Sequence, residues 1–134
     1  MLNAAVIGLG WWGKHIISCL EDSDRINISM AMDISSNEGK DFASQSGLKF
    51  TDKFDEVLKS KDIDAVIIVT PHSLHEEQVI KAADAGKQIF CEKPFSLTSE
   101  SAKRMLSACQ EHNLVVGIGH ERRFEYGLIE MKKM

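Results

Sequence analysis

Three glycines near the start of the chain have the spacing of a phosphate-binding loop. Gly8, Gly10 and Gly13 form G-x-G-x-x-G directly after one apolar stretch, and Asp33 ends a second, residues 28–32. In that context the glycines allow a sharp turn, close approach of a pyrophosphate and tight packing of a helix on a strand. The helix N-terminus offers free N–H groups to the phosphates, and the acid accepts hydrogen bonds from ribose hydroxyls. The sequence therefore predicts a nicotinamide dinucleotide site.

Two other interpretations of the same loop remain open. A methyltransferase also has glycines after its first strand and an acid after its second, but usually lacks the third glycine at this spacing. A glycine-rich turn in another α/β domain is the second alternative.

The acid also bears on which dinucleotide is bound. A carboxylate at Asp33 repels the 2′-phosphate of NADP and bonds the 2′-hydroxyl of NAD. No arginine follows it, because Ile34 and Ser35 are the next residues. We expect NAD, with NADP less favoured.

The composition is that of one ordinary globular domain. The 134 residues are 43% hydrophobic with a net charge of −4, which favours neither nucleic acid nor a membrane surface as partner. No apolar run approaches the roughly 20 residues of a membrane helix, and no signal peptide is visible. Cys19, Cys91 and Cys109 lack C-x-x-C spacing and are expected to be buried thiols in a reducing cytoplasm. The histidines show no metal spacing, so no metal is predicted.

Strand and helix patterns alternate six times along the chain. The strands are expected at residues 4–7, 27–33, 49–51, 65–70, 88–91 and 114–118. The run AVIIVT at 65–70 is apolar throughout, which is typical of a strand buried on both faces of a parallel sheet. Capping boxes beginning at Ser35 and Ser73 are expected to start two of the helices. Right-handed crossovers then predict an α/β fold, a doubly wound Rossmann sheet in the order 3-2-1-4-5-6 between two helix layers.

The residues that could do chemistry all follow the carboxyl ends of these strands. They lie at 8–13, 33, 70–75, 92–94 and 120–123. Ligands on doubly wound sheets bind beyond the carboxyl ends, at the switch between the first and fourth strands. One site at one edge of the sheet is therefore predicted.

Five motifs carry a resemblance to a known family. GLGWWG, Asp33, TPHSLHEE, CEKPF and GHERRF occur in this order, each after the expected strand. With them the chain resembles the N-terminal half of the Gfo/Idh/MocA family, the relatives of glucose-fructose oxidoreductase and inositol dehydrogenase. The resemblance covers essentially all 134 residues, and E-K-P is its most specific part.

The resemblance implies that Lys93 is the active-site lysine. Oxidation of an alcohol sends a hydride to the nicotinamide and removes a proton from the hydroxyl, so a proton acceptor has to stand within hydrogen-bond reach. The alternative, a solvated loop lysine, is disfavoured by the position of E-K-P. The family also implies a cis peptide bond before Pro94.

The other motif residues are implied to surround the same cofactor. His72 stands where the family commonly has Asn. His75 would flank the nicotinamide or, as a capping-region histidine, contact the loop. One tryptophan would cover the pyrophosphate or the nicotinamide edge, or one would pack on the helix and the other would face the absent half. The expected cofactor contacts are Gly8, Leu9, Gly10, Trp11, Trp12, Gly13, Asp33, Thr70, Pro71, His72, His75, Glu92, Lys93 and Arg122.

The resemblance also implies how the chain is organised and what it does. Residues 1–123 would form the dinucleotide-binding domain, and residues 124–134 would begin the helix that leads to an absent α/β substrate domain. With that half attached, we expect hydride transfer to or from a sugar, cyclitol or similar polyol, in a homo-oligomer. Without it, cofactor binding but no useful turnover is expected. The alternative function is a non-catalytic NAD-binding sensor or regulatory module, which the absent half favours and E-K-P disfavours.

Overall fold

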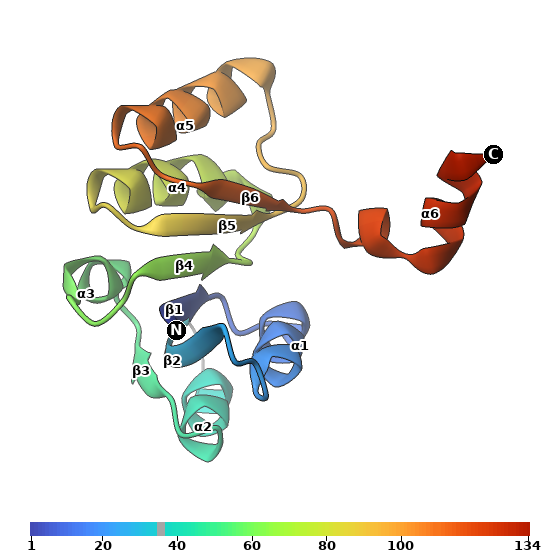
Figure 1. Cartoon of the computed structure of the whole chain (residues 1–134). Coiled ribbons are helices and arrows are strands. Elements are labelled where there is room, and N and C mark those ends of the chain that lie inside the picture. Colours follow the sequence, from blue (N-terminus) through green and yellow to red (C-terminus); the bar gives the residue numbers. More distant parts are fainter. Residues whose placement is uncertain (35–36) are drawn as a thin grey trace.

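The fold is built on one parallel sheet of six strands. The computed structural model describes residues 1–34 and 37–134 (Figure 1). The strand order is β3-β2-β1-β4-β5-β6, and every neighbouring pair is parallel. The strands are β1 (Leu2–Ile7), β2 (Ile26–Met32), β3 (Lys49–Thr51), β4 (Ala65–Ile68), β5 (Gln88–Glu92) and β6 (Val116–Gly119). The predicted doubly wound order is confirmed.

Helices cover the two faces of the sheet. They are α1 (Trp11–Leu20), α2 (Asn37–Gln45), α3 (Phe54–Lys59), α4 (His75–Asp84), α5 (Ser99–Glu111) and α6 (Tyr126–Lys133), with short 3-10 turns η1 (His72–Leu74) and η2 (Glu121–Phe124). On one face, Val57 of α3, Val79 of α4 and Met105 of α5 pack in one buried cluster; on the other, Ile17 of α1 and Ala43 of α2 pack in a second. The apolar run of β4 is buried throughout, because Val66 and Ile68 pack in the first cluster and Ala65 and Ile67 in the second.

The strand register brings the ends of the strands to one level. Ile7 pairs with both Met32 and Ile68, and Ile68 pairs with Cys91. The loops after β1, β2, β4 and β5 therefore leave the sheet at the same edge, as the sequence predicts.

The N-termini of α4 and α5 differ in whether a side chain caps them. Thr98 caps α5, since its Oγ1 accepts the N–H of Ser101 at 3.1 Å. The capping box predicted at Ser73 is wrong. The turn η1 runs directly into α4, so Leu74 at the helix start already has helical dihedral angles and makes no side-chain cap. The other predicted cap, Ser35, lies outside the described residues.

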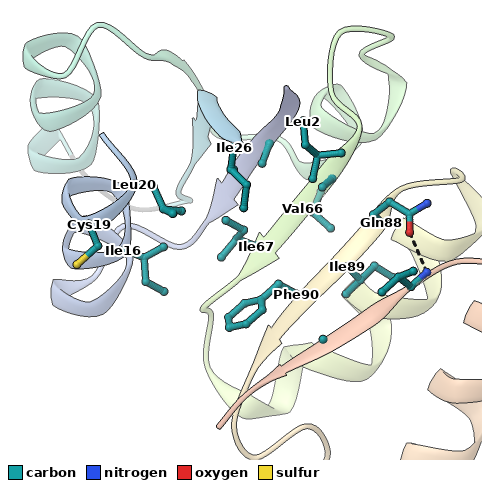
Figure 2. A pocket seen from close by; sticks show the side chains of 14 residues that line it. Leu2, Ile16, Cys19, Leu20, Ile26, Val66, Ile67, Gln88, Ile89 and Phe90 are labelled. Atoms are coloured by element: carbon teal, nitrogen blue, oxygen red, sulfur yellow. Dashed lines mark hydrogen bonds between the residues drawn. The ribbon is translucent and has the colours of Figure 1, made fainter. Parts of the chain in front are cut away.

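On one face of the sheet, no helix of the described residues lies over β5 and β6. Beside α1, a hollow of about 860 Å³ lies over β4, β5 and β6, and Figure 2 shows the side chains that line it, such as Ile67 and Phe90. At its rim Val115 is 72% exposed. Cys19 of α1 also lines the hollow and is exposed, so the prediction of three buried thiols is wrong for this residue. None of the described helices covers Cys19, whereas Cys91 and Cys109 lie in the core.

The last helix stands apart from the sheet. Figure 1 shows α6 projecting from the body beyond β6, joined to it through η2. Its apolar side chains Tyr126 and Met131 are exposed. Within the described ranges, no helix is long and apolar enough to cross a membrane.

Candidate functional site

Each glycine of the loop after β1 is suited to its position for a different structural reason. Gly8 has a φ of +103°, in the left-handed region where a side chain is strained. A Cβ on Gly13 would overlap the carbonyl oxygen of Gly8, so this glycine permits close packing of α1 on the loop. A Cβ on Gly10 would meet nothing within 4 Å, so the space above the loop is open. The turn at Gly8 and the close packing at Gly13 match what the spacing predicts, while the approach of a pyrophosphate over Gly10 stays a prediction.

The open space lies at the start of α1. Gly10 is the N-cap, and none of the described side chains caps the helix. The first N–H groups of a helix have no acceptor within it and carry a partial positive charge. The start of α1 can therefore accept an anionic group.

Asp33 is held against the same loop. Its Oδ2 accepts the N–H of Leu9 at 2.7 Å. A hollow of about 550 Å³ extends from Asp33 and is also lined by Lys40 and Thr51. A carboxylate beside this hollow can accept hydrogen bonds from hydroxyl groups such as those of a ribose.

The loop after β4 places its residues in two different settings. Pro71 and His72 are exposed, and the Thr70 hydroxyl donates to Gln78 Oε1. His75 is fully buried, with Nδ1 3.0 Å from the Pro94 carbonyl oxygen and Nε2 3.0 Å from that of Thr70. Of the two interpretations of His75, the structure therefore favours loop contact over a direct place beside the nicotinamide.

The turn after β5 carries the predicted lysine. Lys93 is exposed, and its peptide bond to Pro94 is cis, as the resemblance implies. It lines a hollow of about 190 Å³ together with His120, Glu121, Arg122 and Arg123. The structure thus brings Lys93 and Arg122, which are distant in sequence, to one place.

Glu92, next to the lysine, is a buried carboxylate that is 8% exposed. Its Oε1 accepts the Nε1–H of Trp12 at 2.8 Å, and its Oε2 accepts the N–H of Lys93 at 3.1 Å. Gly119 at the end of β6 lies against this carboxylate. Sequence reasoning missed Gly119, since only the pairing of β5 with β6 places it there.

The two tryptophans of the loop have separate environments. Trp11 is 76% exposed and its ring stacks on His15, with centroids 5.5 Å apart. Trp12 is half-buried and turns toward Glu92. His15 was also missed, although its spacing of four from Trp11 puts both on one side of a helix.

Along the sheet edge, the site changes in character from one end to the other. An acid, Asp33, stands at one end, the open glycine loop lies in the middle, and the cations Lys93 and Arg122 share a hollow at the other. Among residues 1–34 and 37–134, no three His, Cys, Asp or Glu side chains gather so as to hold a metal ion.

Known proteins share this sequence and this fold. The chain is 34% identical over 134 residues to an uncharacterized oxidoreductase of Streptococcus pneumoniae, covering 100% of this chain and 36% of that protein. It is 32% identical to the 2,7-anhydro-N-acetylneuraminate hydratase of Mediterraneibacter gnavus, covering 97% and 34%. The chain therefore spans about a third of the length of these curated relatives.

A solved structure extends the comparison to a cofactor complex. The scyllo-inositol dehydrogenase of Lactobacillus casei, with bound NAD(H) and scyllo-inositol, superimposes with a TM-score of 0.91 at 28% identity, covering 99% of this chain and 40% of that one. A family model described as "Oxidoreductase family, NAD-binding Rossmann fold" matches residues 2–120. The chain thus belongs to the Gfo/Idh/MocA family of oxidoreductases, as its NAD-binding Rossmann domain.

Proposed function

We propose that this chain binds NAD and supplies the reactive lysine of a dehydrogenase that acts on a sugar, a cyclitol or a similar polyol. The observation that carries the proposal is the shared hollow of Lys93 and Arg122, at the same sheet edge as the open glycine loop. A relative named for an anhydro sugar acid and a structural neighbour that binds scyllo-inositol support the substrate class.

The residues present fit the dinucleotide. The loop from Gly8 to Gly13, with the start of α1, would hold the pyrophosphate, and Asp33 the adenosine ribose. Thr70, Pro71 and His72 would line the middle. The Asp33 carboxylate favours NAD, although Lys40 lines the same hollow and would favour a phosphate.

At the other end, Lys93 would accept the proton of the substrate hydroxyl. When bound, the nicotinamide ring supplies the hydride acceptor. Trp12, Glu92 and Arg122 would border the nicotinamide end of the site. Trp11 would lie on its exposed side, and the buried His75 would support the loops below it. We propose that residues 1–123 form the cofactor domain and that residues 124–134 begin the connection to further polypeptide, in a homo-oligomer of the whole protein. Because Lys93 is exposed here, substrate retention needs such a second wall.

The same exposure of Lys93 favours a second candidate, a non-catalytic NAD-binding sensor. The two functions share the cofactor site and differ only in whether Lys93 meets a substrate. Adding scyllo-inositol and other polyols, with NAD, to the chain joined to the further polypeptide proposed above, and following NADH absorbance, separates them. Reduction of NAD that is lost in Lys93→Met supports the enzyme, and tight binding without any reduction favours the sensor.

The cofactor assignment is tested by titrating the chain with NADH and with NADPH while following tryptophan fluorescence. Trp11 and Trp12 lie in the loop, so bound NADH should quench them. Asp33→Ala should weaken NADH binding about tenfold or more, because charged hydrogen bonds are lost. Asp24→Ala, in the exposed turn before β2, is the matched control. Unchanged affinity in Asp33→Ala, or tighter binding of NADPH than of NADH, would contradict the assignment.

A further inference from the structure

The Glu92 carboxylate joins two segments that stand on different strands. A carboxylate taken out of water needs hydrogen-bond donors, and Glu92 has one for each oxygen. The Trp12 indole donates to Oε1 at 2.8 Å across 80 positions of sequence, and the Lys93 main-chain N–H donates to Oε2 at 3.1 Å. One donor belongs to the glycine loop and its helix, and the other to the lysine turn.

The space for this carboxylate exists because residue 119 is glycine. Gly119 pairs with Glu92 between β5 and β6. A Cβ on Gly119 would lie 2.5 to 2.8 Å from the carboxylate atoms of Glu92. Gly119 does not have a positive φ, so the requirement here is room rather than backbone freedom.

We propose that Glu92 is a positioning residue that fixes the glycine loop to the lysine turn through Trp12, with Gly119 leaving room for its carboxylate. This proposal rests on the proposed function, in which both segments hold one dinucleotide. The loop sets where the pyrophosphate lies and the turn sets where Lys93 lies. Joining them before the cofactor arrives fixes the separation of the two and removes the cost of ordering them on binding.

The indole N–H is the feature that makes Trp12 suitable. Tryptophan donates only from Nε1, and a bond from it to an ionised carboxylate is stronger than a neutral one. Trp11, the adjacent residue, is exposed and stacks on His15. The two tryptophans therefore provide an internal comparison.

The hydrogen bond is tested first in the chain without cofactor. The two indole N–H signals in a ¹H–¹⁵N spectrum are assigned with Trp11→Phe. We expect the Trp12 proton to exchange with solvent at least about tenfold more slowly than that of Trp11, because it is hydrogen-bonded and half-buried. Glu92→Ala should remove this protection. Equal exchange of the two protons in the unmodified chain would overturn the proposal.

The positioning role is tested with matched glycine variants. Gly119→Ala should displace the carboxylate, abolish the slow indole signal and weaken NADH binding about tenfold. Gly127→Ala on α6, where a Cβ meets nothing within 4 Å, should change neither. Affinity for ADP-ribose, which lacks the nicotinamide, should change less than about twofold in Gly119→Ala, a difference that a merely structural defect would not produce. Equal losses for both ligands, or no loss for either, would overturn the role.

Two further controls keep the outcomes separate. If Gly119→Ala fails to fold, Trp12→Phe removes the donor without adding bulk, and the same comparison of NADH with ADP-ribose decides. If the unmodified chain binds no NADH, the proposed function fails and the positioning role fails with it. Slow exchange of the Trp12 proton would then show only that the carboxylate contact itself is present.

Discussion

Among single residues, His75 is the polar side chain held most completely by the protein. Its ring is fully buried, and each nitrogen lies 3.0 Å from a main-chain carbonyl oxygen, one before Pro71 and one after Lys93. The ring therefore ties the loop after β4 to the lysine turn from beneath. Removing it would leave the carbonyl groups of Thr70 and Pro94 without this partner.

His75→Ala should lower the free energy of unfolding by about 2–4 kcal/mol, through lost hydrogen bonds and the cavity left behind. Urea denaturation followed by circular dichroism measures this. The control is His112→Ala at the exposed end of α5, where the change should stay within about 0.5 kcal/mol. Equal losses in the two variants would show that His75 does not hold the loops.

The three cysteines should differ in reactivity. Burial, with a smaller effect of the neighbouring Glu92, raises the pKa of the Cys91 thiol to about 12, and burial also raises the pKa of Cys109. A thiol with a raised pKa stays protonated until the pH approaches that value, and only the thiolate attacks a disulfide reagent. Near neutral pH the folded chain should react with such a reagent at Cys19 alone, and at the other two only after unfolding. Rapid reaction that persists in Cys19→Ser would contradict this.

At the scale of elements, we expect two glycines of the same loop to affect different properties, one the free energy of unfolding and the other the binding of NADH. Gly13→Ala should lower the free energy of unfolding by about 2–3 kcal/mol, because the methyl group overlaps the loop backbone. Gly10→Ala should cost at most about 1 kcal/mol, the usual difference at an N-cap. It should instead weaken NADH binding, since its methyl group enters the open space.

Urea denaturation and NADH titration of both glycine variants test the distinction. A Gly10→Ala chain that is as unstable as Gly13→Ala, or that binds NADH normally, would refute the assigned roles.

The sequence predicts the elements well because each has a strong local signal. The apolar run of β4, the periodic helices and the glycines identify the elements from local patterns, and the rule of right-handed crossovers then gives the strand order. The predicted capping box at Ser73 fails because a capping box needs an extended residue before the helix, and η1 instead continues into α4. Sequence spacing alone cannot show that a 3-10 turn precedes a helix.

Within the site, the order of motifs predicts which residues gather at the edge, and Lys93 with Arg122 is an example. It does not predict which side chains touch. The Trp12–Glu92 bond and the two contacts of His75 depend on how three loops pack, and no periodicity links residues 80 positions apart. The separate environments of Trp11 and Trp12 are hidden for the same reason.

At the scale of the whole molecule, the uncovered half of the sheet should bind apolar dyes. The hollow over β4, β5 and β6 is lined mainly by aliphatic and aromatic side chains. The folded chain should enhance the fluorescence of anilinonaphthalene sulfonate. Phe90→Ser combined with Val115→Ser should reduce the fluorescence enhancement at least about twofold, because the two substitutions remove much of the exposed apolar surface of the hollow.

Leu97→Ser is the control for the dye measurement, since Leu97 is 66% exposed but lies outside the hollow. Dye emission that falls equally in the control would show that the sheet face is not where the dye binds.

The position of that uncovered face has a practical consequence for engineering. None of the described residues that line the hollow also lines the pocket of Lys93 and Arg122. The hollow is lined mainly by side chains along the strands, whereas that pocket lies beyond the carboxyl ends of the strands. The exposed side chains Phe90 and Val115 of the hollow can therefore be replaced by polar ones while the edge is left untouched. A small, soluble reporter of the cellular nicotinamide pool could be built from this domain in that way.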